Sequence, residues 1–451
     1  MNKDIKIMLI LIFTVIALAS FPSYANSQKV VSISAGMVHN MVLLDDGTVW
    51  GWGSNDEGQL GIGNNLLTPV SIPAQAKIAN VTEISTGLMH SLALKDDGTV
   101  WAAGDNRYYQ LGRADLKNSS VFLQVDGLTN ITEISAGAKH NIALRTDGTV
   151  WSWGANDHGQ LGDGTLVNSA TPVRVLGLEN IIAVCGSGEF AIKDDGSVWT
   201  WGDTVLDVDT SGHVKGDAGT YVNCKTTPFQ LNGIKNITSI DTDGSHTILV
   251  DANGTAWTWG FDEYGQLGDG TNYMAPNPPF VSVPIKLSNL DNVKAVITGS
   301  FYSLALKSDG SVWAWGSNDG GQHGDGTIGD IKSTPTYTGL DHVEEISAGS
   351  LGGIALKDDN TVYSWGGNGG GQLGNGSIGG HQLSPIQVIE PWKTSDNSTT
   401  ITNNSDTSSI NSDTSSIHYP SNDIMYLVAG IVLLFSVIVV IYFVAKSSRK
   451  R

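Results

Sequence analysis

The sequence predicts an all-β fold, a seven-bladed β-propeller of four-stranded antiparallel blades, together with one C-terminal transmembrane helix. Three observations lead to this prediction. A unit of about 50 residues recurs seven times along the chain. Each unit alternates apolar and polar residues with a period of two and contains a dipeptide suited to a tight turn. Near the end of the chain, 21 successive residues carry no charge, and ~20 are needed to cross a bilayer.

The recurring unit contains the motif Asp-Gly-Thr-Val-Trp. The motif occupies residues 46–50, 97–101 and 147–151, and four close variants follow. Successive copies lie 51, 50, 48, 58, 56 and 50 residues apart, and twelve of the 13 tryptophans fall within the units. Such units bury their apolar faces only against their neighbours. The tryptophans that end the motif are therefore expected to be structural: Trp50, Trp101, Trp151, Trp199, Trp257 and Trp313.

Each unit is expected to supply four strands. Ile-Ser-Ala-Gly-x-x-His precedes an alternating run such as residues 91–94, then come Asp-Gly, Val-Trp-x-Trp-Gly and Gly-Gln-Leu-Gly. The alternation indicates half-buried strands, and Asp-Gly favours the tight turn that joins two antiparallel strands. In the seventh unit Asn360 replaces the turn glycine, and asparagine also tolerates positive φ. Further strands are expected around residues 131–135 and 171–175, which completes a propeller blade.

The two ends of the repeat array predict how the ring closes. The first unit starts abruptly at Val30 and lacks a preceding Thr-Pro-Val strand, whereas the seventh unit is followed by an extra strand at residues 384–388. We expect this C-terminal strand to complete the first blade, which would remove an exposed sheet edge. An open solenoid is the alternative architecture.

Outside the propeller, which we place at residues 29–390, the chain changes character. Residues 1–25 combine a basic opening, an apolar stretch and small residues before a cleavage position, so a secretory signal peptide is predicted. An uncleaved anchor is the alternative. Residues 394–422 are mainly Ser, Thr, Asn and Asp and are predicted to form a disordered stalk.

A transmembrane helix is predicted over residues 423–445, followed by a basic tail at residues 446–451. Basic residues stay on the cytoplasmic side of a membrane. We therefore expect a single-pass cell-membrane protein whose propeller is extracellular. Sequons in an exported chain permit glycosylation, and they occur at Asn80, Asn118, Asn130, Asn236, Asn253, Asn375, Asn397 and Asn403.

Charge argues against nucleic acid as a ligand. Residues 26–421 contain 19 basic and 42 acidic residues, so the net charge of this region is 19 − 42 = −23. Binding to a duplex needs clustered lysine and arginine that displace counterions. We expect no nucleic-acid partner.

The repeated motifs resemble the regulator of chromosome condensation repeat family. The resemblance rests on Ser34-Ala35-Gly36-x-x-His39, on residues 46–53 and on Gly58-Gln59-Leu60-Gly61, which recur in register. It implies a seven-bladed propeller but is weak for function, because one fold serves many activities. The founding member is a nucleotide-exchange factor inside the nucleus, and an exported chain would not meet its partner. We therefore expect no nuclear GTPase partner. Secreted proteins similar to this family include an inhibitor of β-lactamases, a precedent for a binding role.

Four histidines share one repeat position: His39, His90, His140 and His246. A ring of imidazoles around an axis could hold a metal. Glycine or tyrosine takes the position in the other units, at Gly188, Tyr302 and Gly352. This replacement favours a structural hydrogen bond within each blade, and no metal is expected there.

No catalytic residue is predicted. Asp45-x-Gly47-x-x-Trp50 overlaps the aspartate box of sialidases, but that box is a structural turn. Sialidases also need an arginine cluster and acids at one mouth, and the propeller has four scattered arginines. A glycan-active hydrolase or lyase is the less favoured alternative.

An insertion at residues 203–224 interrupts the fourth unit. Asp207, Asp209 and Ser211 within it begin like a calcium loop, but Ala218 stands where the glutamate at the twelfth position is required. A solvated acidic loop is the alternative to a calcium site, and no other cofactor is expected. The insertion ends at Cys224, which would pair with Cys185 in an exported protein; two buried thiols are the alternative.

Variation between equivalent loops gives the clearest functional signal. Just before Gly-Gln-Leu-Gly, the aligned residues are Glu57, Tyr108, His158, Tyr264, Gly320 and Gly370, and the second unit reads Asn106-Arg107-Tyr108-Tyr109. Repeated geometry would place them on one rim, where tyrosine and arginine suit binding. A second irregular patch, residues 271–284, includes Tyr273. The candidate binding residues are Arg107, Tyr108, Tyr109, His158, Tyr264 and Tyr273, and drift of tolerant loops is an equal alternative.

These observations predict a membrane-anchored, cell-surface propeller that binds an extracellular protein or glycan. An exported enzyme that acts on surface polysaccharide and a passive envelope or adhesion component are the alternatives.

Overall fold

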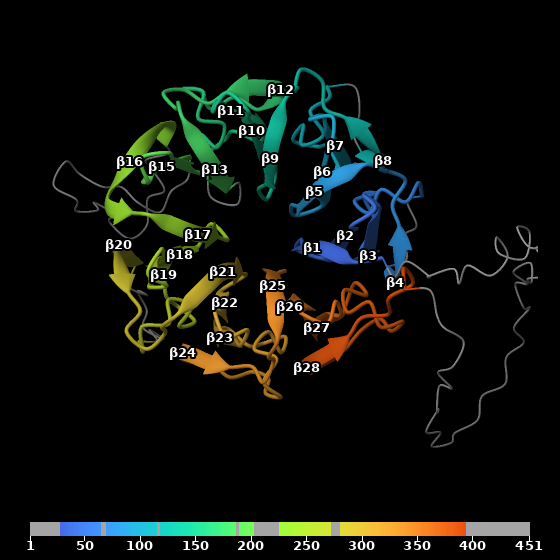
Figure 1. The fold of residues 1–451 in the computed structure, drawn as a ribbon, viewed down its shortest axis with the longest axis vertical. Coiled ribbons are helices and arrows are strands. Elements are labelled where there is room, and N and C mark those ends of the chain that lie inside the picture. The colour runs from blue at the N-terminus through green and yellow to red at the C-terminus, as the bar shows by residue number, and fades with distance from the viewer. Residues whose placement is uncertain are drawn as a thin grey trace, which may run out of the picture. The chain divides into compact units, whose positions relative to one another are not determined.

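The structure is a computed structural model that describes residues 28–64, 69–114, 118–185, 189–202, 225–271 and 280–393. These residues form 28 β-strands arranged as a closed ring of seven sheets (Figure 1). Contacts divide the chain into two units, residues 1–394 and residues 395–451, and the ring belongs to the first. The prediction of an all-β, seven-bladed propeller is confirmed.

Every blade consists of four consecutive strands that run from the axis outward. The innermost strands are β1 (Val30–Ala35), β5 (Val81–Thr86), β9 (Ile131–Ala136), β13 (Ile181–Cys185), β17 (Ile237–Thr242), β21 (Val293–Gly299) and β25 (Val343–Ala348). The second strands are β2 (His39–Leu44), β6 (His90–Lys95), β10 (His140–Arg145), β14 (Phe190–Lys193), β18 (His246–Asp251), β22 (Tyr302–Lys307) and β26 (Gly352–Lys357). The third strands are β3 (Val49–Gly53), β7 (Val100–Asp105), β11 (Val150–Gly154), β15 (Ser197–Gly202), β19 (Ala256–Phe261), β23 (Val312–Gly316) and β27 (Val362–Gly367). The outer strands are β4 (Val70–Gln75), β8 (Asn118–Gln124), β12 (Ser169–Arg174), β16 (Lys225–Lys235), β20 (Phe280–Lys286), β24 (Lys332–Tyr337) and β28 (His381–Gln387).

The register within the blades repeats from one unit to the next. All neighbouring strands are antiparallel, and the repeat histidine opens the second strand opposite a glycine of the third, as in His39 opposite Gly53 and His140 opposite Gly154. The turn between these strands is the Asp-Gly turn, where Gly47 has φ 77°. Asn360 adopts φ 65° in the seventh unit, as predicted from its tolerance of positive φ.

Ring closure differs from the prediction. We expected the C-terminal strand to complete the first blade, but β28 pairs with β27 of its own blade and β4 completes blade 1. The expectation was wrong because the Thr-Pro strand follows the tryptophan strand within each unit. Residues 70–75 therefore form the outer strand of blade 1, and no strand from the other end of the chain is required.

Side chains close the ring between blades 7 and 1. Val30 N donates to Asn360 Oδ1 over 2.8 Å, and Ile33 N donates to Glu345 Oε1 over 3.2 Å. Trp392, which follows β28 and is 3% exposed, joins one apolar cluster with Val30 and other residues of blade 1. Its ring centroid lies 5.9 Å from that of Trp50. An open solenoid is excluded, since the first and last blades share a core.

The same kind of packing joins the other blades. Each apolar cluster spans a boundary between two blades; one unites Leu92 and Leu94 of blade 2 with Ile134 and Trp153 of blade 3. The second tryptophan of the motif is buried in each of the six blades that have it. In five of them it donates through Nε1 to the backbone of the preceding blade, as Trp153 does to Gln110 O over 2.9 Å. A single blade could not bury these surfaces, which is why the units fold only as a ring.

The predicted end segments lie outside the described residues: the signal peptide, the stalk at 394–422, the transmembrane helix at 423–445 and the tail. Among the residues that the structure describes, no helix is long and apolar enough to cross a membrane. The export and membrane topology thus stay predictions.

Candidate functional site

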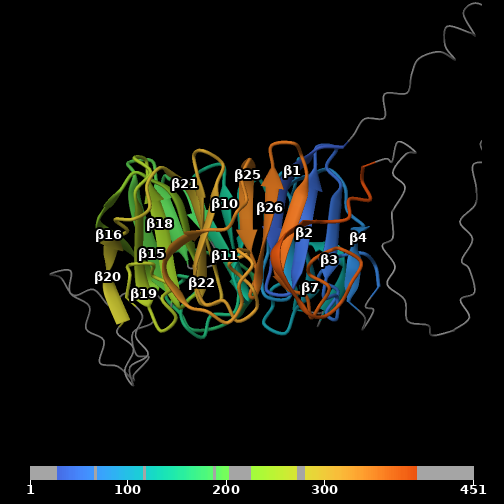
Figure 2. The same cartoon turned by 90° about the horizontal axis from the view of Figure 1, so that it is seen from below.

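The ring has two distinct faces (Figure 2). One face carries the Asp-Gly turns. The other, which we call the loop face, carries the short loops between first and second strands and the long loops between third and fourth strands, because these strands end on the same side. The two sets of loops are in contact, since Ser54 N in a long loop donates to Val38 O in a short loop over 2.9 Å.

The six aligned residues of the long loops occupy equivalent positions, as predicted. In each of these loops the backbone N–H of the aligned residue donates to the side-chain oxygen of the glutamine two positions later. The donors are Glu57, Tyr108, His158, Tyr264, Gly320 and Gly370, with donor to acceptor distances of 2.6 to 3.1 Å. One loop conformation therefore presents Glu, His or Tyr side chains in four blades and glycine in two, all on one face.

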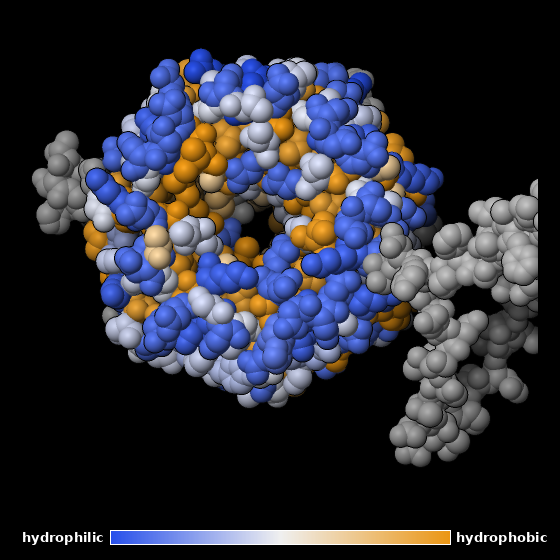
Figure 3. All heavy atoms as spheres, viewed as in Figure 1, coloured by the Kyte–Doolittle hydropathy of each residue, from blue (hydrophilic) through white to orange (hydrophobic). Residues whose placement is uncertain are grey.

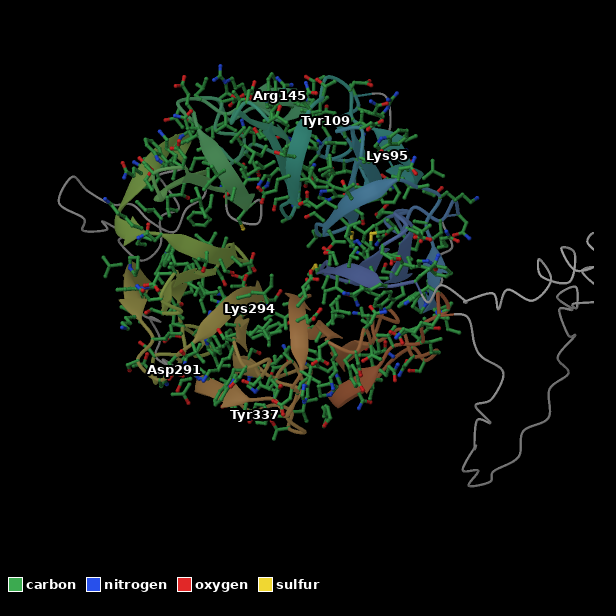
Figure 4. All side chains as sticks on the ribbon, in the orientation of Figure 1. Lys95, Tyr109, Arg145, Asp291, Lys294 and Tyr337 are labelled. Carbon is green, nitrogen blue, oxygen red and sulfur yellow. The ribbon has the colours of Figure 1, made fainter. Side chains whose placement is uncertain are left out.

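Tyr109 departs from this common loop. It has φ 68°, in the left-handed region, and the equivalent residues in the other five loops are glycines. A bulky side chain in this region strains the backbone by about 1 to 3 kcal/mol. The Tyr109 residue nevertheless stays 37% exposed to solvent. In Figure 4 it lies well away from Lys294, which stands beside the central opening.

The residues beside Tyr109 are held by charged neighbours. The exposed Arg107 donates through Nε to Asp105 Oδ1 over 2.9 Å, and its Nη2 lies 3.5 Å from Glu57 Oε1. Asp105 raises the pKa of Arg107 further. Lys139 Nζ of the next blade lies 4.5 Å from the centre of the Tyr108 ring. Arg107, Tyr108 and Tyr109 thus form one patch, which we call the blade 2 patch.

The structure separates the other predicted binding residues from this patch. Tyr264 lies three blades away in blade 5, where its ring centroid is 5.2 Å from that of Phe301. His158 in blade 3 lies 3.5 Å from Asp157. Tyr273 is outside the described residues. Sequence reasoning missed Lys139 and Phe301, although both immediately precede the repeat-histidine position and vary between units as the long loops do.

The repeat histidines join blades, which corrects the expectation of a hydrogen bond within each blade. Nε2 of His39, His90 and His246 bonds the next blade: to Ser91 Oγ (2.8 Å), Asn141 Oδ1 (2.6 Å) and Ser303 Oγ (2.8 Å). His140 Nε2 lies 3.1 Å from Glu189 Oε1 of blade 4, with both side chains buried. The second strand begins at the blade boundary, so its first side chain reaches across it.

Burial lowers the pKa of two of these imidazoles. Burial, with a smaller effect of His90, lowers the pKa of His39 to about 3. Burial likewise lowers the pKa of His90. Tyr302, at the same repeat position in blade 6, donates its hydroxyl to Gly352 O over 2.8 Å. Among the described residues no group of three or more His, Cys, Asp or Glu side chains could hold a metal ion.

At the axis, the innermost strand of each blade has an unpaired sheet edge, and glutamate side chains accept hydrogen bonds from backbone N–H groups there. Glu83 accepts from Ile134 N (3.3 Å) and Glu133 accepts from Val184 N (3.2 Å), in each case in the next blade. Burial is the main cause that raises the pKa of Glu83 to about 8 and that of Glu133 to about 7. Figure 3 shows the opening that these strands surround. The carboxyl groups are thus structural partners of backbone N–H groups.

Two further predictions cannot be followed in the structure. The calcium candidates Asp207, Asp209 and Ser211 lie outside the described residues, and so does Cys224. Cys185 ends β13, and its Sγ lies 3.8 Å from Asp241 Oδ1. The disulfide and the calcium site stay predictions.

The fold and the loop face define a repeat propeller of the kind that presents variable loops on a rigid ring. The RCC1-like domain model matches residues 17–282, more than half of the chain. Models of the regulator of chromosome condensation (RCC1) repeat match residues 293–322, 343–372 and 359–401. The chain therefore belongs to the RCC1 repeat family of β-propellers, as the resemblance implied.

Individual relatives agree with this assignment. The chain is 29% identical over 311 residues to the human E3 ubiquitin-protein ligase HERC2, which covers 67% of this chain but 5% of HERC2. It is 29% identical over 335 residues to the Regulator of chromosome condensation of Xenopus laevis, covering 69% of this chain and 77% of that protein.

Solved structures show the same fold. The crystal structure of Prp20p from Saccharomyces cerevisiae, described with its binding properties to Gsp1p and histones, has a TM-score of 0.63 and 24% identity, and covers 73% of this chain and 84% of Prp20p. Yeast RCC1 (Prp20) bound to Kap60 has a TM-score of 0.65 and 20% identity, and covers 82% of this chain and 86% of that one.

These relatives overturn one expectation about partners. We expected no nuclear GTPase, yet the relatives include Prp20p, which binds the nuclear GTPase Gsp1p and also histones. The expectation was wrong because it was derived entirely from the predicted export of the chain. Family membership and the propeller itself give no ground for excluding such a partner.

Proposed function

We propose that this chain is a protein-interaction module that recognises its partner through the blade 2 patch on the loop face. The observation that carries the proposal is Tyr109, an exposed aromatic residue with φ 68° where the five equivalent loops have glycine. Residues held in such a strained backbone conformation cluster at functional sites.

The chemistry of the patch supports this role. Tyrosine buries a large contact area with few rotatable bonds lost, and both tyrosine and arginine are enriched where protein interfaces are strongest. Arg107 is held by Asp105 and Glu57, and Lys139 lies over the Tyr108 ring. The patch is therefore partly ordered before a partner arrives, which lowers the entropic cost of binding.

His158 and Tyr264 occupy the same loop position in blades 3 and 5. We include them as outlying contacts for a partner large enough to span several blades. The alternative of a passive surface component requires neither the patch nor the strained residue.

The relatives suggest which partners to test first. Prp20p binds Gsp1p and histones, and we propose these two protein classes as the first probes. The activity of HERC2 is not proposed for this chain, because the chain matches 5% of it.

The location of the chain is part of the proposal and decides which partners it meets. Gsp1p and histones probe the patch in vitro, whereas an extracellular propeller would meet extracellular proteins. The predicted signal peptide, stalk and C-terminal apolar segment favour a single-pass cell-membrane protein with an extracellular propeller. Protease treatment of intact cells tests this location. Digestion of a tag placed before the stalk, with protection of a tag after residue 451, is expected; protection of both tags would contradict it.

A binding assay tests the patch. Purified Gsp1p and histones are passed over the immobilised full-length chain and over an Arg107→Ala/Tyr108→Ala variant. Loss of a central hot spot weakens binding by about 2 kcal/mol or more, so at least a tenfold rise in Kd is expected. The control is Tyr337→Ala, which removes a comparably exposed tyrosine (39%) from the outer strand β24. Unchanged binding by the patch variant would reject the patch, and no binding of either probe would reject these partners.

A further inference from the structure

A second group of exposed apolar residues lies on the loop face, in blades 5, 6, 7 and 1. Met37, Phe301 and Leu351 are 40%, 42% and 43% exposed. They belong to the short loops of blades 1, 6 and 7, and the half-buried Tyr264 of blade 5 adjoins them. We call these four residues the apolar arc.

Contacts between successive loops show that the arc is continuous. The rings of Tyr264 and Phe301 are 5.2 Å apart. Next along the arc, Ser300 Oγ and Ser350 Oγ are hydrogen-bonded at 3.1 Å, which brings the loops of Phe301 and Leu351 together. Ser350 N then donates to Met37 O over 3.3 Å across the boundary between blades 7 and 1.

Phe301 is held in an unfavourable backbone conformation. Its φ is 61°, which is rare for a bulky residue. Phe301 N donates to Asp243 Oδ2 over 3.2 Å, and Asp243 is itself 3.1 Å from His246 Nδ1. Although burial opposes it, His246 and these hydrogen bonds hold the pKa of Asp243 below its usual range. Asp243, which contacts both Phe301 N and His246 Nδ1, thus fixes the loop that exposes the ring.

The long loops around the arc are acidic. The exposed tips of the adjacent long loops are Asp56, Glu263 and Asp319. The long loops of these four blades, residues 54–69, 262–279, 317–331 and 368–380, contain no lysine or arginine. Lys332, the first residue of β24, is paired with Asp325 and Asp330. The long loops that surround the apolar arc therefore carry net negative charge, and the nearby cations Arg107 and Lys77 lie at its blade 1 end, against Glu57 and Gly63.

We propose that the apolar arc docks a basic amphipathic segment of a partner protein. Apolar side chains of the segment would cover Phe301, Leu351 and Met37, which removes exposed apolar surface from water. Lysine or arginine side chains on either side would meet the acidic loop tips, which speeds association and selects against acidic segments. This surface is separate from the blade 2 patch, where Arg107 and Lys139 supply positive charge, and it shares only Tyr264 with the outlying contacts proposed above.

Model peptides test the charge and the apolar requirement separately. A fluorescently labelled peptide of leucine and lysine with helical amphipathic spacing is titrated with the full-length chain at about 150 mM salt, where weak long-range attraction is screened. Two control peptides replace lysine by glutamate or leucine by serine. Only the leucine and lysine peptide is expected to bind. Equal binding of the serine and lysine peptide would show mere charge attraction and overturn the proposal.

Variants then locate the site. Phe301→Asn/Leu351→Ser removes the apolar contacts while asparagine keeps the positive φ, and Glu263→Lys/Asp319→Lys reverses the charge. Each is expected to raise the peptide Kd at least tenfold without lowering the melting temperature. Arg107→Ala/Tyr109→Gly is the control and should leave peptide binding unchanged. Binding that survives both arc variants, or a chain that proves to be a dimer through this face, would overturn the proposal.

Discussion

Two regions of this molecule depart from the repeat for different reasons. At the boundary between blades 7 and 1, Asn360 takes the place of the turn glycine of the other units, and Trp392 lies outside the units. Both residues contact blade 1. In the long loop of blade 2, Tyr109 replaces the glycine of the other units, and in the long loop of blade 5, Asp262 replaces their asparagine. Neither residue takes part in ring closure. The first departures stabilise the fold. The second should cost stability, which is expected if they serve another purpose.

The two kinds of departure can be distinguished by the sign of the change in the free energy of unfolding. Restoring the usual residue, or removing the extra one, should destabilise the protein at the closing boundary and stabilise it in the loops.

The largest effect is expected for Trp392→Ala. The residue is 3% exposed and packs against Trp50 and Val30, and removal of such a buried ring costs about 3 to 5 kcal/mol. Thermal unfolding followed by circular dichroism measures the loss. Val167→Ala, at a residue that is 69% exposed, is the control and should change stability by less than about 0.5 kcal/mol. Equal stability of the two variants would remove Trp392 from ring closure.

Asp262→Asn should stabilise the protein in a pH-dependent way. Asp262 is fully buried, and burial raises its pKa to about 6. In other blades the equivalent asparagine donates to a loop carbonyl, as Asn55 does to Asn64 O over 2.8 Å. The pKa of this carboxyl is higher in the folded protein than in the unfolded chain, where it is about 3.8. Its contribution to stability is therefore complete below pH 3.8 and is lost as the pH rises through 6.

The gain from Asp262→Asn is therefore expected to be on the order of 2 kcal/mol above pH 7 and close to zero below pH 4. Urea unfolding of both proteins at several pH values measures this difference. A gain that does not depend on pH would mean that the carboxylate charge is not the cause.

Asn360→Gly should destabilise the protein by about 1 kcal/mol, the net value of a backbone hydrogen bond. Glycine suits φ 65° at least as well as asparagine, but it removes the acceptor of Val30 N. Amide exchange at Val30, measured beside the melting temperature, should become faster. An increase in stability would show that the turn conformation outweighs the contact with blade 1.

Tyr109→Gly should stabilise the protein by about 1 kcal/mol through relief of strain, while weakening capture of the partner at the blade 2 patch. Chemical denaturation and the binding assay are read on the same preparation. Stability and binding that both fall would mean that Tyr109 is a packing residue.

Much of the fold was predictable from the sequence because the repeat signals each element seven times. The Asp-Gly turns, the positive φ of Asn360 and the equivalent places of Tyr108 and Tyr264 all followed from register. The way in which the ring closes was not predictable from the sequence, because a strand motif does not show whether that strand is the first or the last of its blade. Trp392 offered a signal as the one tryptophan outside the units. The partners of the histidines could not be inferred, because sequence spacing does not distinguish a contact within a blade from one across a boundary.

Because no strand is shared between the first and last blades, the chain termini can be moved to the boundary between any other two blades. Asn360 binds both ends of the ring: its Oδ1 accepts from Val30 N, its Nδ2 donates to Gln28 O, and its own carbonyl accepts from Lys393 Nζ. A short linker could therefore join residue 28 to residue 393, with new termini cut between any two blades. Circular permutants of this propeller would keep seven whole sheets, so whole units could be gained, lost or reordered in evolution without dividing a sheet.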